Sequence, residues 1–552
     1  MPPWGARRDR LVVGLDFGTT FSGCAGVKRT AAGDPALLNS PRWGFQIKPN
    51  ELRLHYIKLL LDHHQRLPPY VSRQHLAGLL LRWDKSAEQA VSDYLTALFS
   101  HAKTRLERRF PLMVATTQID IVITVPAVWS DAAKDVTMRA AEKAGMGENL
   151  FMVSEPEAAA IYAMKSIDVQ QKLCETGDNF ILCDAGGGTV DLASFEVASV
   201  SPLRLVESAP GFGALCGSVF LNLKFQDLVR RRMGADDFQS FCDKNPGAWA
   251  VAHKYFEDYV KRNFDPVDHE TEFDDGQFNV PFPGVKDNLA AGIMGSFITL
   301  TNADVSEIFR PIVDKVIELV ERQRNVLAAH GKTAKGLILV GGFGASCYLY
   351  RCLKSRFADE DPPPSYTSSI EESATTEEEV RRFIIMQPEN SWTAVVRGAV
   401  LTGLERDLVV SRKARRHYGV VCNAPWDPSL HSPKNKFVDR ITKELGAKNQ
   451  MLCLTEDRWP GEGSGSESSA RIIVSDAEVP PQEYEPTNET RVLCTLSTDL
   501  DEIPRKHFRR RMIHGQTYYS LDWKLGMTFD ERLTFDQRID DEVYGSIEAV
   551  YT

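Results

Sequence analysis

Apolar and polar positions alternate in several short stretches of the chain, and the clearest of these stretches is divided by glycines. Residues 180–183 form an apolar run that leads into Asp184, and residues 186–188 are all glycine. Apolar and polar residues then alternate over residues 190–197. Alternation with a period of two is typical of a half-buried strand, and glycines between two such runs indicate a turn. Residues 179–197 are therefore predicted to form two strands joined by a glycine turn.

A second copy of this pattern lies near the N-terminus, in residues 11–27. The apolar run there ends in Asp16, and Gly18, Thr19 and Thr20 precede a second strand-like run. Glycine lets the backbone approach a ligand, consecutive backbone N–H groups suit phosphate, and an aspartate at a strand end suits a metal ion or its waters. One copy alone would fit a plain hairpin turn equally well. Two copies favour two similar lobes that each offer a phosphate-binding hairpin to one nucleotide.

Helical periodicity appears between the two hairpins. Residues 86–109 place their apolar side chains on one stripe, which predicts a helix that faces the core. Residues 119–129 have the composition of a strand closed by Pro126, and Ser130 is a suitable N-cap for a helix that ends at Gly145. A strand that leads directly into a capped helix is an α/β unit.

The same periodicity returns in the second half of the chain. Residues 312–327 carry apolar side chains on one helical face, with Pro311 predicted to open this helix and Gly331 to end it. Residues 336–346 predict a strand, a glycine turn and the start of a helix. Residues 391–404 predict a closing helix.

Three other segments have a weaker pattern. Residues 51–67 predict a short helix, in which Lys58 is either a phosphate contact or an exposed helical lysine. Residues 359–380 are acidic and polar, which predicts a loop. Residues 405–552 show strand-like alternation and contain a glycine- and serine-rich stretch, residues 461–470, that predicts a flexible loop.

Composition narrows the class of protein. The chain has 552 residues, 43% of them apolar and 25% charged, as expected of a soluble globular protein. Its net charge of −10 disfavours general nucleic-acid binding. No run approaches the ~18 apolar residues of a membrane span, and residues 1–10 lack the apolar core of a signal peptide. The ten cysteines form no Cys-x-x-Cys pair, so we expect buried thiols and a cytoplasmic, or else nuclear, protein.

Five motifs occur in an order that resembles a known family. The segments GLDFGTTFS, VPAVW, SEPEAAA, DAGGGTVD and LVGGFGAS begin at Gly14, Val125, Ser154, Asp184 and Leu339. Together they resemble the 70 kDa heat-shock protein family of the actin-like ATPase superfamily. The segments AVWSDAAK, SEPEAAA and RKARRHYG resemble in particular its divergent group 12 branch. The resemblance covers roughly residues 11–404.

The family resemblance implies an α/β fold of the duplicated, two-lobed actin-like ATPase type, with ribonuclease H-like lobes. Lobe one would span about residues 11–175 and lobe two about residues 176–404, after a disordered lead over residues 1–10. Residues 405–552 would form a β-rich region, as a reduced remnant of the family's substrate-binding unit.

The resemblance also implies roles for individual residues. Asp16, Asp184 and Asp191 would hold magnesium, mostly through water. The catalytic residues would be Glu155, Asp184, Lys58 and Thr189. The nucleotide contacts would be Gly18, Thr19, Thr20, Gly186, Gly187, Gly188, Thr189, Gly217, Asp258, Lys261, Arg262, Gly341, Gly342 and Gly344. These residue types suit phosphoryl transfer, which needs positioning, magnesium and a placed water more than covalent groups.

The chain departs from the family pattern in two nucleotide-binding segments. Residues 216–220 read Cys-Gly-Ser-Val-Phe where the family has Gly-Gly-Glu-Asp-Phe, and Phe343 and Ala345 replace polar residues near the expected base. Asp258, Lys261 and Arg262 fit the family's Glu-x-x-Lys-Arg spacing for adenosine, whereas Glu257 is one residue out of place. A solvated charged helix face is the alternative interpretation of this segment.

The segment between Asp16 and Lys58 spans 42 residues and is shorter than in the family. Residues 407–410, Asp-Leu-Val-Val, resemble only faintly the family's apolar linker.

The sequence thus predicts a chaperone-like ATPase that binds ATP or ADP with Mg²⁺ and couples its nucleotide state to lobe closure. Its expected partners are unfolded client polypeptides or co-chaperones, not nucleic acid. Two alternatives stay open at this point: a nucleotide-gated interaction module that does not hydrolyse ATP, and a small-molecule kinase on the same fold. The sequence does not indicate an oligomeric state.

Overall fold

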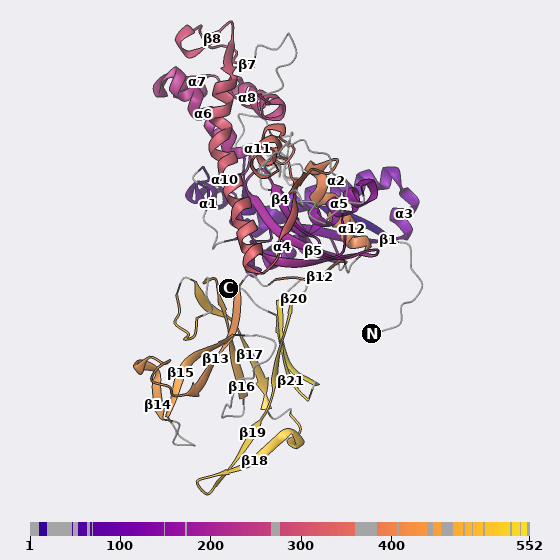
Figure 1. Ribbon diagram of the computed structural model, residues 1–552, viewed down its shortest axis with the longest axis vertical. Coiled ribbons are helices and arrows are strands. Elements are labelled where there is room, and N and C mark those ends of the chain that lie inside the picture. The colour runs from indigo at the N-terminus through magenta and orange to yellow at the C-terminus, as the bar shows by residue number, and fades with distance from the viewer. Residues whose placement is uncertain are drawn as a thin grey trace, which may run out of the picture. The chain divides into compact units, whose positions relative to one another are not determined.

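The computed structural model divides the chain into two compact units, Met1–Lys413 and Ala414–Thr552 (Figure 1). It describes residues 10–18, 47, 53–62, 67–68, 70–147, 149–171, 174–266, 276–358, 383–405, 408–413, 416–438, 445–453, 467–477, 481–487, 489–500, 503–529, 533–540 and 542–548.

The first sheet of the first unit has three parallel strands in the order β1-β2-β3. A core of helical and strand residues lies on one face of this sheet and includes Val91, Leu95, Ile123 and Ala140. The elements are β1 (Arg10–Leu15), the 3-10 helix η2 (Ile57–Leu60), α1 (Arg73–Arg82), α2 (Ala87–Arg109), α3 (Pro111–Thr116), β2 (Gln118–Val125), α4 (Asp131–Lys143) and β3 (Leu150–Ser154).

Local side-chain chemistry fixes the starts of α2 and α4. Ser86 and Gln89 form a capping box at the start of α2, and the Ser130 hydroxyl accepts a hydrogen bond from the backbone N–H of Ala133. Gly145 follows the end of α4 with a φ of 80°, a conformation that glycine adopts without strain. Both predicted helices and the strand before Pro126 are therefore confirmed.

The second sheet has six strands in the order β11-β10-β4-β5-β6-β12. Strands β4 and β5 form the predicted hairpin, pair antiparallel and place Asp184 directly opposite Asp191. The strands are β4 (Asn179–Ala185), β5 (Val190–Val200), β6 (Leu203–Ala214), β10 (Ala334–Val340), β11 (Ile384–Met386) and β12 (Val409–Ser411).

Two helices connect the sheets at the centre of the unit. Helices α5 (Glu155–Gln171) and α12 (Ala394–Leu404) pack against one another, and strands of both sheets contact them. A Cβ atom on Gly398 would lie 1.7 Å from the carbonyl oxygen of Ala158, so only glycine permits this approach. The predicted closing helix is confirmed.

The long helix α10 (Asn302–Ala329) begins nine residues earlier than predicted. The prediction that Pro311 opens this helix is wrong, because Thr301 and Asp304 form a capping box and Pro311 lies inside the helix. A strong cap and a continuous apolar face outweigh the loss of one N–H donor at the proline.

The elements α6 (Val219–Met233), α7 (Ala235–Lys244), α8 (Pro246–Tyr255), β7 (Gln277–Pro281) and β8 (Ile293–Met294) gather at one end of α10 in Figure 1. The same region contains the π-helix η3 (Phe256–Val260), α9 (Lys261–Asn263), the 3-10 helix η4 (Leu289–Ala291) and β9 (Phe297–Thr301). The predicted strand, turn and helix at residues 336–346 correspond to β10 and α11 (Cys347–Phe357), and Ser346 caps α11.

Strand β12 ends the first unit as an edge strand in parallel pairing with β6. Leu408 and Val409 are buried, and the backbone N–H of Leu205 donates to the carbonyl oxygen of Leu408 over 2.7 Å. Arg412 forms an ion pair with the buried Glu157, in the first turn of α5. Residues 408–413 overlap the segment that faintly resembles the family's linker. They are thus attached to the second sheet.

The second unit is all β among its described residues, apart from short 3-10 turns. One sheet has the order β14-β15-β13-β16-β17 and another β20-β21-β22, and their shared core includes Tyr418, Ile472 and Phe535. The strands are β13 (His417–Pro425), β14 (Lys436–Val438), β15 (Leu445–Cys453), β16 (Glu467–Ser475), β17 (Thr490–Asp499), β18 (Phe508–Ile513), β19 (Gln516–Leu521), β20 (Lys524–Phe529), β21 (Leu533–Ile539) and β22 (Glu542–Glu548).

The predicted β-rich region is confirmed, but the predicted loop at residues 461–470 extends too far. Residues 467–470 belong to β16, where Ala470 is buried opposite Leu496. Residues 461–466 and the acidic segment 359–380 lie outside the described residues.

Two predictions from composition concern the whole chain. In the part of the chain that the structure describes, no helix combines the length and the apolar character needed to cross a membrane. The eight cysteines whose side chains are described are all free thiols, and Cys174, Cys183, Cys216 and Cys494 are buried.

Candidate functional site

A buried ion pair joins η2 to the start of α5. Lys58 Nζ lies 2.5 Å from Glu155 Oε1, and the Lys58 side chain is only 2% exposed. The ammonium group also lies over the rings of Phe17 and Trp129, with centroid distances of 5.6 and 5.4 Å. Lys58 is therefore not an exposed helical lysine, which was one of the two interpretations of its segment.

Two hydrogen bonds hold the chain just after the short helix η2. Asp62 accepts hydrogen bonds from both the backbone N–H and the hydroxyl of Ser130, at 3.1 and 3.0 Å. Among residues 53–62, helical structure is limited to η2, so the predicted longer helix is reduced to a single turn here. These contacts connect the Lys58 turn to α4 and explain how a buried lysine is held in place.

Three further carboxyl groups, those of Asp16, Asp184 and Asp191, interact electrostatically with Glu155 of this ion pair. Burial raises the pKa of Asp184 well above its usual value, and the charges of Glu155, Asp191 and Asp16 raise it further. Burial also raises the pKa of Glu155 to about 7, against the opposing charge of Lys58, while Asp16 and Asp191 raise it. The structure thus brings together the predicted catalytic and metal-binding acids from three strand ends and one helix start.

Neighbouring hydroxyl groups orient two of these acids. Thr124 donates to Asp16 Oδ1 over 3.1 Å, and Thr189 donates to Asp191 Oδ2 over 2.8 Å. Thr189 therefore lies at the site. Thr124 is a site residue that sequence reasoning missed, and its place in an apolar strand gave no signal.

Backbone hydrogen bonds join the glycine turn of the β4–β5 hairpin to the start of α6. The backbone N–H groups of Gly217, Ser218 and Val219 donate to the carbonyl oxygens of Gly188, Gly186 and Gly187. A Cβ atom on Gly217 would lie 2.4 Å from the Gly187 carbonyl oxygen, so this contact requires glycine. Gly217 thus packs against the backbone of the hairpin.

A third glycine turn meets the same hairpin from β10. Gly341 has a φ of 89°, and a Cβ atom there would lie 2.4 Å from the Ala185 carbonyl oxygen and 2.5 Å from Asp184 Oδ1. Phe343 and Gly344 both donate backbone hydrogen bonds to that carbonyl oxygen. Phe343 is buried in the core and Gly342 is exposed, so Gly342 and the neighbouring Ala345 face outward.

A polar cluster with one buried lysine lies on the next helices of lobe two. Asn222 Nδ2 and Lys261 Nζ both donate to Glu257 Oε2, over 2.6 and 2.8 Å. Lys261 is buried, and burial lowers its pKa, which the charge of Glu257 partly offsets. Asn222 Oδ1 is buried and accepts no hydrogen bond from the described residues.

The acid that joins this cluster lies in the π-helix η3. A π-helix adds one residue to a turn, and in this turn Glu257 pairs with Lys261 four positions later. Asp258 instead pairs with the exposed Lys254, and Arg262 is exposed. Of the predicted adenosine residues, the structure therefore places Lys261 in the cluster, together with Glu257 in place of Asp258.

Three aromatic side chains link lobe one to this cluster. Tyr56 packs on Tyr70 with ring centroids 5.4 Å apart, and Tyr70 packs edge-on against Phe220 at 5.2 Å. Burial and the charge of Glu257 both raise the pKa of Tyr56. Tyr56 lies in the predicted short helix and Tyr70 follows it, and sequence reasoning missed both as site residues because Tyr70 contacts Phe220, far along the chain.

Comparisons with known proteins agree with these observations. The family model described as Hsp70 protein matches residues 86–200, which include β2, α5 and the β4–β5 hairpin. Heat shock 70 kDa protein 12A of Homo sapiens is 22% identical over 532 residues, covering 78% of this chain and 75% of the relative. Heat shock 70 kDa protein 12B of Homo sapiens is 23% identical over 538 residues, covering 78% and 73%.

The chain thus contains an Hsp70 family match over residues 86–200 and is similar to heat shock 70 kDa proteins over most of its length. The resemblance seen in the motifs and the predicted two-lobed actin-like fold are confirmed. The resemblance to the Hsp70 family implies nucleotide binding.

The acids of this Hsp70-type site have the chemistry of a magnesium site, although they do not form a complete metal cage. Among the described residues, no group of three or more His, Cys, Asp or Glu side chains is arranged to hold a metal ion by itself. Mg²⁺ usually keeps several waters and binds one or two carboxylates together with substrate phosphates. The carboxylate oxygens are suitable ligands, and the charges of Glu155, Asp191 and Asp16 repel that of Asp184. Both features fit a hydrated Mg²⁺ that arrives with a nucleotide. Gly18 is the last described residue after β1, and Thr19 and Thr20 lie outside the described residues.

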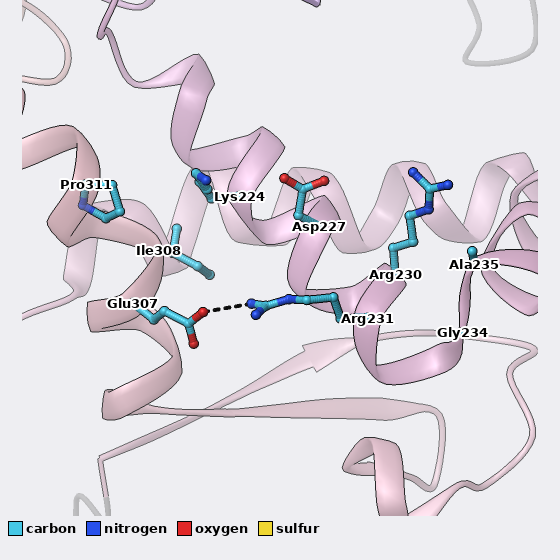
Figure 2. A pocket seen from close by; sticks show the side chains of 9 residues that line it. All are labelled: Lys224, Asp227, Arg230, Arg231, Gly234, Ala235, Glu307, Ile308 and Pro311. Carbon is cyan, nitrogen blue, oxygen red and sulfur yellow. Dashed lines mark hydrogen bonds and ion pairs between the residues drawn. The ribbon is translucent and has the colours of Figure 1, made fainter.

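A separate groove lies on lobe two of this Hsp70 relative. Figure 2 shows it between α6 and α10, with an ion pair between Arg231 and Glu307 across it. Its volume is about 640 Å³, and Lys224, Asp227 and Arg230 also line it. None of its lining residues belongs to the carboxylate site.

Proposed function

We propose that this protein binds ATP with Mg²⁺ and hydrolyses it as a chaperone-like ATPase of the Hsp70 type. The observation that carries the proposal is the buried Lys58–Glu155 ion pair beside Asp184. Asp184 lies near the end of β4, just before the glycine turn of the β4–β5 hairpin. A buried cation next to clustered carboxylates is an arrangement that structural packing alone rarely requires, because desolvating charges is unfavourable.

Glu155 and Lys58 would have different roles in hydrolysis. Glu155, with a pKa near 7, exists partly as the carboxylate at neutral pH and can accept a proton from an attacking water. The water oxygen would bond to the γ-phosphorus, the bond to the bridging oxygen would break, and ADP would leave with that electron pair. Lys58 would hold Glu155 in position and offset negative charge on the γ-phosphate.

The nucleotide would be held by backbone and polar groups from both lobes. The hairpin glycines Gly186, Gly187 and Gly188 allow phosphates to approach the backbone. Glu257, Lys261 and Asn222 supply donors and an acceptor of the kind that ribose hydroxyls need. Mg²⁺, held mostly through water by Asp16, Asp184 and Asp191, would supply neutralisation of the phosphate charge.

A non-hydrolysing, nucleotide-gated module is the second candidate function. It is favoured by the side chains of Ser218 and Val219, which stand where the family has an acidic pair and carry no carboxylate. It is also favoured by the burial of Phe343 in the core. In this case nucleotide binding would change the arrangement of the lobes without turnover.

Single-turnover hydrolysis on purified full-length protein separates these functions. Magnesium-dependent binding with turnover that Asp184→Ala abolishes would support the ATPase. Binding without turnover would support the nucleotide-gated module. If Asp184→Ala left both nucleotide affinity and turnover unchanged, the site assignment would be wrong. If the wild-type protein did not bind nucleotide, the family relationship would describe ancestry only.

The nucleotide state would act on partners through lobe closure, as a cytoplasmic chaperone with unfolded clients or co-chaperones. The relatives named as heat shock proteins support this part of the proposal. A client assay with a denatured model protein, with and without ATP, tests it independently of hydrolysis.

A further inference from the structure

The last turns of α2 and the short helix α3 form an exposed arm at the edge of the first unit, and we call residues 100–116 the α2–α3 arm (Figure 1). The buried residues of α2 end at Leu95, and Leu98 and Phe99 are the last apolar residues of this helix that pack against the core of the first sheet. No residue of α3 is buried. Packing in the core therefore does not explain the apolar residues of the arm.

Three large apolar side chains are exposed where α2 meets α3, and we call them the apolar tip. Phe110 is 40% exposed, Leu112 is 76% exposed and Met113 is 41% exposed. Single exposed apolar residues are common on protein surfaces, but apolar side chains that gather in one patch mark an interaction site. The guanidinium group of Arg109 lies over the Phe110 ring, 5.5 Å from its centroid, so a cation accompanies the tip.

Basic side chains precede the apolar tip along α2. Lys103, Arg105, Arg108 and Arg109 are all exposed, and Glu107 is the one acid among residues 103–109. Four cations less one acid give this stretch a charge of +3, in a chain whose net charge is −10. Lys103, Arg105 and Arg108 form no ion pair with the residues that the structure describes. Their charge is therefore available to a partner outside the chain.

The length of α2 separates this charge from the core of the first sheet. Residues 100–109 advance about 15 Å along the helix axis, because each residue of an α-helix adds about 1.5 Å. The Debye length at physiological ionic strength is about 8 Å. Repulsion between an anionic surface at the tip and the net negative charge of the chain is therefore largely screened, whereas the cations of the arm lie close to that surface.

We propose that the α2–α3 arm binds an anionic lipid membrane surface. The apolar tip enters the boundary between head groups and acyl chains, and Lys103, Arg105 and Arg108 contact the anionic head groups. A lipid surface accepts a projecting apolar tip without a matching pocket. A protein partner needs a pocket shaped for three large side chains, so an acidic protein is the less favoured occupant of the arm.

Vesicle flotation with the full chain tests this proposal. One set of vesicles contains equimolar phosphatidylserine and phosphatidylcholine, and the other contains phosphatidylcholine alone. Labelled poly-glutamate serves as the acidic polypeptide. The tip variant changes Phe110, Leu112 and Met113 to Ser, and the basic variant changes Lys103, Arg105 and Arg108 to Gln.

Each variant has a matched control with the same residue types elsewhere in the first unit. Leu289, Met294 and Phe297 are 80%, 66% and 44% exposed, and the apolar control changes these three residues to Ser. The basic control changes Lys224, Arg230 and Arg231 of the lobe two groove to Gln, which removes the same charge (Figure 2).

We expect the wild type and both controls to bind the anionic vesicles and not the neutral ones, and each arm variant to bind at least about tenfold more weakly. Binding of either arm variant at the wild-type level would overturn the proposal, as would an equal loss in its control. Absence of wild-type binding to anionic vesicles would also overturn it. If poly-glutamate then bound in an arm-dependent way, the occupant would be an acidic protein.

Hydrogen exchange on the wild type locates the contact without relying on variants. Anionic vesicles should slow exchange of the amides in residues 105–116, and unchanged exchange there would contradict the proposal. Leu112→Ser alone should give an intermediate loss of affinity if the triple tip variant does not fold.

Discussion

Arg412 donates two hydrogen bonds to the two carboxylate oxygens of Glu157, from Nε over 3.0 Å and from Nη2 over 2.5 Å. Glu157 lies two residues after Glu155 in the first turn of α5, and Arg412 directly follows β12. The segment that ends the first unit is therefore attached to the helix that begins with the proposed catalytic acid.

Replacing Arg412 by Ala should release β12 from the second sheet. Glu157 would remain buried without its bidentate partner, at a loss of about 1–2 kcal/mol because the arginine is itself half exposed. Hydrogen exchange should become faster in residues 408–413. Lys165→Ala, which removes the exposed Lys165–Glu405 pair, is the control and should change exchange little.

Lys58→Met should abolish single-turnover hydrolysis while the protein stays folded. Methionine fills the space between Phe17 and Trp129, but it neither holds Glu155 nor offsets phosphate charge. We expect a loss of about 10²-fold or more in rate. Lys332→Met removes a half-exposed pair with Glu196 and serves as the control. Turnover at the wild-type rate in Lys58→Met would exclude Lys58 from catalysis.

Hydrolysis should rise with pH through about 7. The pKa of Glu155 is raised to about 7, mainly by burial, so its carboxylate form, which accepts the proton, increases as pH rises through that value. Loss of Lys58 should move this midpoint to higher pH, since the lysine lowers the pKa of Glu155. A rate profile measured from pH 5.5 to 8.5 checks both statements, with ~7 as the expected midpoint. A flat profile in the wild type would contradict a role for Glu155 as base.

Phe220→Ala should speed nucleotide release. Its edge-on contact with Tyr70 joins the lobes, and loss of such a pair corresponds to a change of about threefold to tenfold. Tyr70→Phe is the matched control, because it keeps the ring and removes a buried hydroxyl that has no hydrogen-bond partner in the described residues. Stopped-flow release of a fluorescent nucleotide measures both, and equal rates in Phe220→Ala and the wild type would show that the contact does not restrain the lobes.

Glu257→Ala should weaken nucleotide affinity, whereas Asp258→Ala should leave it nearly unchanged. Glu257 receives hydrogen bonds from Asn222 and Lys261, while Asp258 pairs with the exposed Lys254. Removing Glu257 leaves a buried lysine without its partner, which destabilises the cluster. Titration calorimetry with ADP distinguishes the two variants, and the opposite ranking would return the role to Asp258.

The sequence was informative where local chemistry decides the structure. The β4–β5 hairpin and the caps at Ser86 and Ser130 depend on residues close in the chain, and all three were predictable. The start of α10 was not, because Pro311 gives a strong local signal that the cap at Thr301 and the apolar face override.

The candidate site was predictable only in part. Asp16, Glu155 and Asp184 follow from motifs at strand ends and a helix start, because such positions meet at one edge of a sheet. Tyr70, Asn222 and Thr124 take part through contacts with residues far along the chain, which no local pattern encodes.

The π-turn at residues 256–260 affects how this chain can be compared with its relatives. One extra residue in an ordinary helix would rotate everything after it by about 100° and carry Lys261 off its face. The widened turn absorbs that residue, so Lys261 keeps its partner. Roles assigned by the three-residue spacing of the family's Glu-x-x-Lys-Arg motif therefore fall on Asp258, whereas Glu257 is the acid that holds Lys261.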